Sequence, residues 1–234
     1  MLVHIPSVLS EAQISQLRVE LNQAVFVDGR LTAGPIASKQ KNNEELPHSS
    51  DLVRRLGAVV NKGLHENWVF KNAIMPVSNT EPIFARYTQG MAYGQHLDAS
   101  LSAGLSVDGS PLSVPSRFRS DMSCTVFLNS PEEYVGGELI LNTPIGVASV
   151  KYAAGDAVLY PSSYVHEVGE VTAGVRLVSV AWYQCAVRDV EKRSMLYDLI
   201  VASAGLMDRH PDDSATLKVN QVLQNLLRRW GDTR

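Results

Sequence analysis

The chain of 234 residues is 45% hydrophobic and carries a formal net charge of -3. This length suits one domain with at most a small appendage, and the nearly balanced charge argues against a general nucleic-acid or membrane-surface binder. The sequence has no run of about 18 apolar residues and no signal-peptide pattern, so neither a membrane span nor a secretory leader is expected. Cys124 and Cys185 lie in apolar runs without a CxxC pairing, which is typical of buried free thiols in a reducing compartment. We therefore expect a cytoplasmic protein.

The N-terminal part is predicted to contain two helices separated by a long loop. Ser10 and Gln13 have the spacing of a capping box, and the apolar residues that follow share one face, which predicts a helix over residues 11–25. Residues 28–50 are polar and punctuated by Gly and Pro, and long loops of this kind often serve as lids or binding loops. A second amphipathic helix is expected over about residues 51–64.

From about residue 67 to residue 188 the pattern changes to short runs rich in β-branched and aromatic residues. The candidate strands are residues 68–75, 83–88, 122–129, 138–142, 146–152, 156–160, 166–172 and 175–185. Short strands at this spacing predict an antiparallel barrel or a jelly roll made of two sheets. A second loop, residues 99–118, begins directly after Asp98, so we expect it at the mouth of any site that includes that residue.

The C-terminal residues 189–234 are predicted to form a helical extension. Asp189 is the expected cap of a helix that reaches about Ala204, and Ser214 is the expected cap of another. The second helix has an apolar face that must pack on the barrel, on another helix or on a second subunit. A homodimer through these helices is therefore possible.

His96, Asp98 and the more distant His166 are the candidate metal ligands. Residues two apart on a strand point to the same side, so His96 and Asp98 can each offer one atom to the same ion. A jelly roll can bring His166 beside them. Two imidazoles and one carboxylate hold iron(II) on one face and leave the opposite face open. Such triplets also arise by chance, so the spacing alone supports a metal site only as a hypothesis.

Arg176, ten residues beyond His166, is the candidate group for binding an acidic cosubstrate. The turn at residues 172–174 predicts a hairpin in which Arg176 lies next to the strand of His166. A guanidinium can bind a carboxylate with two charge-assisted hydrogen bonds. Tyr87 and Tyr93 flank the HxD triplet and are positioned to add hydroxyl contacts, although Tyr87 fits equally well as a core aromatic residue.

Longer motifs surround these residues. They are residues 86–98 (RYTQGMAYGQHLD), 119–129 (RSDMSCTVFLN), 136–139 (GGEL), 154–163 (AGDAVLYPSS), 166–168 (HEV) and 174–176 (GVR). Together they resemble the bacterial PKHD-type hydroxylases, iron(II)- and 2-oxoglutarate-dependent oxygenases of the prolyl-4-hydroxylase-like superfamily that include the iron-uptake factor group. The resemblance covers nearly the whole chain.

The resemblance implies a mainly β fold, in which a double-stranded β-helix (a cupin-like jelly roll) is flanked by helices. It implies iron ligands at His96, Asp98 and His166, and 2-oxoglutarate bound by Arg176 with Tyr87 at the same site. The implied reaction is a hydroxylation that consumes dioxygen and 2-oxoglutarate and releases succinate and carbon dioxide. Members of the family are also commonly assigned ascorbate as a reductant.

Two functions other than a dioxygenase are compatible with the same kind of fold. A non-catalytic sensor that binds metal and 2-oxoglutarate on the same fold is disfavoured because every expected ligand is present. A hydrolytic or isomerising cupin-like enzyme is disfavoured by Arg176 and the longer motifs. The substrate stays open between a peptidyl residue, a free amino acid and a siderophore-like molecule. Residues 39–45 and 100–117 are the expected specificity elements because of their positions.

Overall fold

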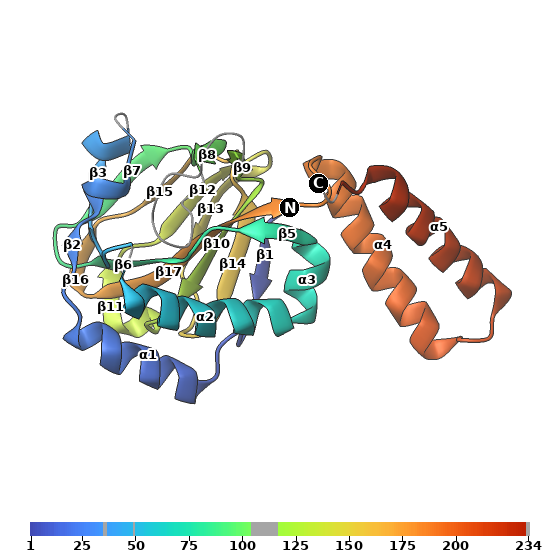
Figure 1. The fold of residues 1–234 in the computed structure, drawn as a ribbon, viewed down its shortest axis with the longest axis horizontal. Helices are drawn as coiled ribbons and strands as arrows, with labels where there is room; N and C mark the ends of the chain where they lie inside the picture. Colours follow the sequence, from blue (N-terminus) through green and yellow to red (C-terminus); the bar gives the residue numbers. More distant parts are fainter. Residues whose placement is uncertain (35–36, 49, 104–116, 233–234) are drawn as a thin grey trace.

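The structure is a computed structural model that describes residues 1–34, 37–48, 50–103 and 117–232. In this part of the chain, two larger antiparallel sheets face each other, three N-terminal helices cover one of them, and two C-terminal helices project to the side (Figure 1). This arrangement confirms the expected mainly β jelly roll with flanking helices. The described helices include none that is long and apolar enough to span a bilayer.

The sheet next to the helices, here called the major sheet, has the strand order β1-β14-β10-β17-β6-β4-β2, and β5 pairs with the far end of β17. Its strands are β1 (Val3–Ile5), β2 (Val27–Asp28), β4 (Glu44–Glu45), β5 (Pro76–Asn79), β6 (Ile83–Tyr87), β10 (Met122–Phe127), β14 (Ala157–Pro161) and β17 (Arg176–Cys185). The predicted strands at 83–88, 122–129, 156–160 and 175–185 are therefore confirmed.

The opposing sheet, here called the minor sheet, has the order β13-β12-β15-β7-β3. Its strands are β3 (Lys41–Asn42), β7 (Ala92–His96), β12 (Leu139–Thr143), β13 (Gly146–Val150) and β15 (His166–Val168). Short ladders also join β8 (Leu101–Ala103) to β9 (Arg117–Arg119), and β11 (Tyr134–Gly136) to β16 (Val171–Gly174). The expected single strand over residues 166–172 is wrong, because the chain leaves the minor sheet after Val168 and pairs with β11 instead.

Both loop predictions need correction. The segment 28–50 contains β2, β3, β4 and the short 3-10 helices η1 (Gly29–Thr32) and η2 (Ala37–Lys39), while residues 35–36 and 49 lie outside the described residues. The loop expected over residues 99–118 begins and ends in the strands β8 and β9, and residues 104–116 lie outside the described residues. A further 3-10 helix, η3 (Pro131–Glu133), precedes β11.

The N-terminal helices are α1 (Glu11–Gln23), α2 (Asp51–Glu66) and α3 (Trp68–Ile74). The predicted capping box between Ser10 and Gln13 is present at the start of α1. However, the strand predicted over residues 68–75 is wrong, because this segment is α3. The Asn67 side chain accepts a hydrogen bond from the Phe70 backbone and caps the helix. Its buried residues recur at helical spacing, which overrides the β propensity of its aromatic and β-branched residues.

Alternation along β17 separates two cores. Leu177, Ala181 and Tyr183 pack toward the helices, whereas Val178 packs between the two sheets, as the period of two requires. Arg176 has the same parity as Val178 and therefore belongs to the interior face of the jelly roll. The helices are thus held by one core, and the interior between the sheets contains a second core together with the face on which Arg176 lies.

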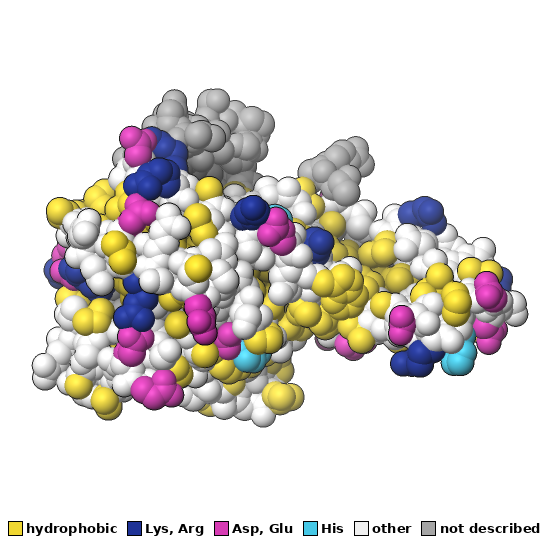
Figure 2. Space-filling model, turned by 90° about the horizontal axis from the view of Figure 1, so that it is seen from below, with side chains coloured by type: hydrophobic (Ala, Val, Ile, Leu, Met, Phe, Trp, Pro, Cys, Tyr) yellow, Lys and Arg dark blue, Asp and Glu magenta, His cyan; other side chains and the backbone are white. Residues whose placement is uncertain are grey.

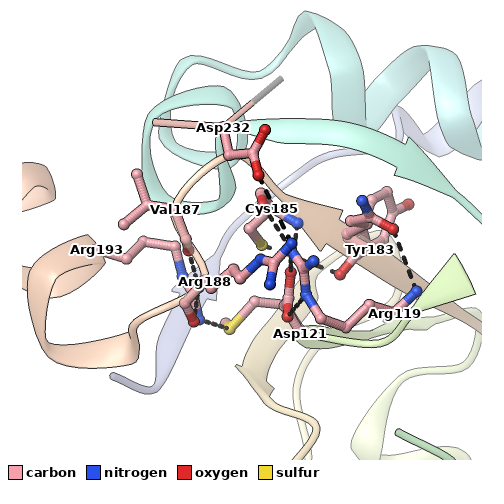
Figure 3. Close-up of polar contacts among 10 residues, drawn as sticks. Arg119, Asp121, Tyr183, Cys185, Val187, Arg188, Arg193 and Asp232 are labelled. Carbon is pink, nitrogen blue, oxygen red and sulfur yellow. Dashed lines mark hydrogen bonds and ion pairs between the residues drawn. The ribbon is translucent and has the colours of Figure 1, made fainter. Parts of the chain in front are cut away.

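The C-terminal helices α4 (Val190–Arg209) and α5 (Ser214–Trp230) pack against each other, so the apolar face of α5 is covered in part by another helix. Asp189 caps α4 as predicted, but α4 extends beyond Ala204, and Asp213 rather than Ser214 caps α5. Figure 3 shows how the hairpin joins the barrel. The fully buried Arg193 donates to the Val187 carbonyl at 2.6 Å and to the Met122 sulfur at 3.0 Å.

Candidate active site

His96, Asp98 and His166 meet between the two sheets. Each offers one ligand atom, and these atoms lie within 4.8 Å of one another. His96 is the last residue of β7 and pairs with His166 of β15 in the minor sheet. Asp98 lies two residues beyond the end of β7, so strand alternation alone does not align its carboxylate with His96. The structure therefore brings the three predicted residues together. Strand alternation, which the sequence analysis used to align Asp98 with His96, is not what places Asp98.

Both imidazoles are held with the same nitrogen facing away from the cluster. Nδ1 of His96 lies 2.9 Å from the Gly94 carbonyl, and Nδ1 of His166 lies 2.9 Å from the Tyr164 carbonyl. A carbonyl only accepts, so Nδ1 of each ring carries a proton, and this leaves Nε2 as the nitrogen that can face a metal. Burial and the neighbouring His166 lower the pKa of His96 to about 4, so its ring is neutral at neutral pH. Neutral imidazoles with a free Nε2 are the form that binds a metal.

The Asp98 carboxylate is held from the major sheet. Ser123 in β10 donates its hydroxyl proton to Asp98 Oδ2 at 2.5 Å. The other oxygen, Oδ1, lies 3.8 Å from His166 Nε2. The side chains of Asp98 and His166 are only 7% and 5% exposed, so the carboxylate depends on a partner inside the protein.

Arg176 approaches the same cavity from the opposite sheet. The expected hairpin beside His166 is wrong, because β17 joins the major sheet between β6 and β10 whereas β15 belongs to the minor sheet. Arg176 is 2% exposed, and no carboxylate among the described residues forms an ion pair with it. Its Nε has no hydrogen-bond partner within the described part of the chain. A buried guanidinium in this state is suited to bind an acidic ligand.

The Tyr87 ring lies against this guanidinium. Tyr87 pairs with Arg176 across β6 and β17, and the guanidinium lies 5.0 Å from the Tyr87 ring centroid. Burial raises the pKa of Tyr87 to about 12, so its hydroxyl stays protonated. Gly137 also packs against Arg176: it has a positive φ of 68°, and a Cβ there would lie 3.1 Å from Arg176 Cδ. The second glycine of the 136–139 motif thus has a packing role behind Arg176.

The segment 41–45 crosses the mouth of the interior from one sheet to the other. β3 pairs with β7 on the minor sheet, and β4 pairs with β6 on the major sheet. Lys41 Nζ lies 2.5 Å from Glu45 Oε1, and both side chains are less than a tenth exposed. Thr32 donates to Glu45 at 2.6 Å and accepts from Lys41 at 2.8 Å. This buried ion pair was not singled out as a site from the sequence, although its segment was an expected specificity element.

Through its ring, Tyr93 contacts both Lys41 of the Lys41–Glu45 ion pair and His96 of the candidate metal-binding cluster. Its ring stacks on His96 with the centroids 3.6 Å apart, and Lys41 Nζ lies 5.5 Å from the same ring. This ring contact fixes the plane of the His96 imidazole, and the contact expected of the Tyr93 hydroxyl stays a prediction.

A large cavity of about 1640 Å³ contains all of these groups. It is lined by the candidate ligands, by Arg176 and Tyr87, and by the buried Lys41 and Glu45. It continues along the interior face of β17 to Trp182 and Gln184. Ligand pockets commonly measure about 300–1,000 Å³, so this cavity has room for a cosubstrate and a separate substrate.

Comparison with known proteins agrees with this geometry. The family model of the 2OG-Fe(II) oxygenase superfamily matches residues 82–184, and that of the PKHD-type hydroxylase C-terminal domain matches residues 191–232. A PKHD-type hydroxylase of Caulobacter vibrioides is 41% identical over 233 residues, which cover 99% of this chain and 100% of the relative.

Solved structures share the fold at lower identity. A Trichoplax adhaerens prolyl hydroxylase, in complex with a hypoxia inducible factor oxygen degradation domain peptide fragment, has a TM-score of 0.54 at 20% identity and covers 83% of this chain and 86% of its own. HygX of Streptomyces hygroscopicus, with nickel, 2-oxoglutarate and hygromycin B bound, has a TM-score of 0.52 at 18% identity and covers 79% and 82%. The full-length identity to the curated relatives shows the family: the chain belongs to the PKHD-type hydroxylases, iron(II)- and 2-oxoglutarate-dependent dioxygenases of the 2OG-Fe(II) oxygenase superfamily.

Proposed function

We propose that the protein binds iron(II) through His96, Asp98 and His166, binds 2-oxoglutarate through Arg176, and hydroxylates a substrate larger than a free amino acid. One observation carries this proposal: a cluster of two imidazoles and a carboxylate shares a cavity with a buried guanidinium that has no carboxylate partner among the described residues. The cluster offers the donor types that iron(II) takes, and the guanidinium offers the charge that binds a carboxylate of 2-oxoglutarate.

The donor set fits iron(II) in type and charge. Nitrogen and carboxylate ligands on one face leave open positions for a chelating 2-oxo acid and for dioxygen. When bound, the iron supplies the activation of dioxygen that accompanies conversion of 2-oxoglutarate to succinate and carbon dioxide. The chain holds the two Nε2 atoms and the Asp98 carboxylate toward one point and surrounds them with Tyr87 and Tyr93. A histidine that donates through Nε2 brings no negative charge, so Asp98 is the one anionic donor of the set.

Arg176 supports the second half of the proposal. A guanidinium can bind the distal carboxylate of 2-oxoglutarate in bidentate fashion, and burial strengthens that bond. Tyr87 covers one face of the guanidinium and limits the approach of water. This assigns to Arg176 and Tyr87 the cosubstrate roles that the sequence suggested.

Replacement of Gly137 by alanine tests the packing behind Arg176. The new Cβ would lie 2.8 Å from Val171 Cγ2 and 3.1 Å from Arg176 Cδ, so the arginine must shift. We expect the 2-oxoglutarate KM to rise about tenfold, because a shifted Arg176 would lose one of its charge-assisted hydrogen bonds to the distal carboxylate. Gly90→Ala is the control, because Gly90 has a φ of 80° and no neighbour within 4 Å of its added Cβ. Equal KM values for the two variants would show that this packing does not affect cosubstrate binding.

The cavity supports a large substrate. Its volume of about 1640 Å³ exceeds what 2-oxoglutarate and a free amino acid would fill. The two solved structures named above were determined with a peptide fragment and with hygromycin B, so proteins of this fold accommodate both kinds of ligand. The Lys41–Glu45 pair in the wall is neutral as a unit and adds no net charge for an ionic substrate. A peptidyl residue or a siderophore-like molecule therefore fits better than a free amino acid.

Four further properties belong to the proposal. Ascorbate would serve as a reductant that keeps the iron ferrous. A cytoplasmic location is supported by the free buried thiols Cys124 and Cys185. A dioxygenase domain over residues 1–188 and a helical extension from 189 fit the start of α4. A homodimer through α4 and α5 is supported by exposed apolar side chains on these helices (Figure 2); they are Met195, Val201, Leu217 and Val222.

Turnover measurements test the function. The purified protein, supplied with iron(II), 2-oxoglutarate and fractions of peptides or metabolites from a cell extract, should form succinate in a fraction-dependent manner. Calorimetry with manganese(II) and 2-oxoglutarate measures binding separately. Tight binding of both, without succinate formation in any fraction, would favour the alternative of a non-catalytic sensor.

A further inference from the structure

Two buried hydroxyls lie behind the Asp98 carboxylate, and neither belongs to the candidate ligand set. Ser123 lies in the centre of β10 and is fully buried, and Ser162 follows β14 and is 3% exposed. The two Oγ atoms are 2.8 Å apart, and Ser123 Oγ is 2.5 Å from Asp98 Oδ2. Along β10, Ser123 lies on the same face as Phe127, which packs in the core between the two sheets. A chain of polar groups here needs a function beyond filling space.

The direction of these hydrogen bonds follows from the number of protons. A hydroxyl has one proton to donate, and an ionised carboxylate can only accept. Ser123 therefore donates its proton to Asp98. Ser162 must then donate to Ser123, since the Ser123 proton is already engaged. Successive hydrogen bonds of this kind polarise one another, so the bond to the carboxylate is strengthened by Ser162.

This chain distinguishes the two carboxylate oxygens. Oδ2 is engaged by Ser123, whereas Oδ1 is the oxygen that lies 3.8 Å from His166 Nε2. A carboxylate without such a partner is free to rotate or to offer both oxygens to one ion. A second oxygen on the ion would fill a position that a chelating 2-oxo acid needs.

We propose that Ser123 is a positioning residue that leaves Asp98 only Oδ1 for the metal, and that Ser162 orients the Ser123 hydroxyl. This inference rests on the proposed role of Asp98 as a metal ligand. It adds that the affinity for the ion depends on a hydroxyl pair in the major sheet, whereas the two histidines come from the minor sheet. The proposed metal site is thus complete only when the two facing sheets are packed as in the folded protein.

The test measures the manganese(II) affinity of the purified, metal-free protein by calorimetry. Ser123→Ala is expected to weaken binding about 10- to 100-fold, the usual cost of losing a partner that orients a ligand. Ser162→Ala should weaken it less, and Ser123→Thr, which keeps the hydroxyl, should restore it. The Tm of each metal-free variant shows whether the fold is intact.

Ser179→Ala is the matched control. Ser179 is as buried as Ser123, lies on the neighbouring β17, and its hydroxyl has no partner within the described residues. Unchanged affinity in Ser123→Ala, or an equal loss in Ser179→Ala, would overturn the inference. If Ser123→Ala does not fold, Ser162→Ala replaces it, and unchanged affinity there has the same meaning.

Asp98→Ala separates this inference from the function on which it rests. Weaker manganese(II) binding in Asp98→Ala together with unchanged binding in Ser123→Ala contradicts only the positioning role. Unchanged binding in Asp98→Ala contradicts the proposed metal site itself.

Discussion

Asp98→Ala is expected to lower succinate formation at least ~100-fold, because losing the ligand itself should cost more than losing a group that merely orients one. Asp98 is the one member of the set that can bring a negative charge to the metal. Its removal therefore takes away the charge attraction as well as one donor. His96→Ala should have a comparable effect, since the cluster then keeps one nitrogen donor.

The companion variant Asp98→Asn separates charge from shape. An asparagine can still accept the Ser123 hydrogen bond through its carbonyl oxygen, but it carries no charge. We expect it to bind manganese(II) more weakly than the unaltered protein and to form little succinate. Asp51→Asn is the surface control, because the Asp51 side chain is 88% exposed at the start of α2. Wild-type-like succinate formation in Asp98→Ala or in His96→Ala would contradict the assignment of the metal site.

Local sequence patterns predicted the strands of the jelly roll but missed the short strands at the mouth of its interior. β2, β3 and β4 are two residues long, and each is defined by pairing with β6, β7 or one another. No periodicity can be detected in two residues, and their partners lie far along the chain. Their polar composition is typical of a loop, which is why the segment 28–50 was predicted as one.

α3 shows a different kind of error. Its aromatic and β-branched residues favoured a strand, yet the sequence also contained the helical signals. Asn67 is a good capping residue, and Phe70, Ala73 and Ile74 have the spacing of one helix face. Contact of that face with the core decided between the two patterns, and such contact is not visible in a window of seven residues.

The candidate site could be predicted in its chemistry more than in its geometry. Spacing and motifs selected the histidines, Asp98 and Arg176 as candidates, and the structure brings them into one cavity. They placed Arg176 beside His166, whereas strands that alternate between sheets put it on the opposite wall. Ser123 was equally invisible, because it contacts Asp98 across 25 positions of the chain and its neighbours look like ordinary strand residues.

Arg176→Met should raise the 2-oxoglutarate KM about 10- to 100-fold, which corresponds to about 1.4–2.8 kcal/mol of lost binding free energy. The same variant should be at least as stable as the unaltered protein in the absence of 2-oxoglutarate. A guanidinium buried without a carboxylate partner carries a desolvation cost that contact with the Tyr87 ring offsets only in part. Methionine has a similar length, contacts the Tyr87 ring well and carries no such cost.

Succinate formation at varied 2-oxoglutarate concentrations gives the KM. Thermal unfolding with and without 2-oxoglutarate measures the stability of the variant and the stabilisation by the bound cosubstrate. In the unaltered protein, a ligand at 100 times its Kd stabilises the folded state by about 2.7 kcal/mol, and the variant should lose most of this gain. Arg193→Met is the matched control, because Arg193 is also fully buried but donates to the Val187 carbonyl and the Met122 sulfur. It should lower the Tm and leave the 2-oxoglutarate KM unchanged. A normal KM in Arg176→Met would mean that another group binds the distal carboxylate, and the buried cation would then need a different counterion.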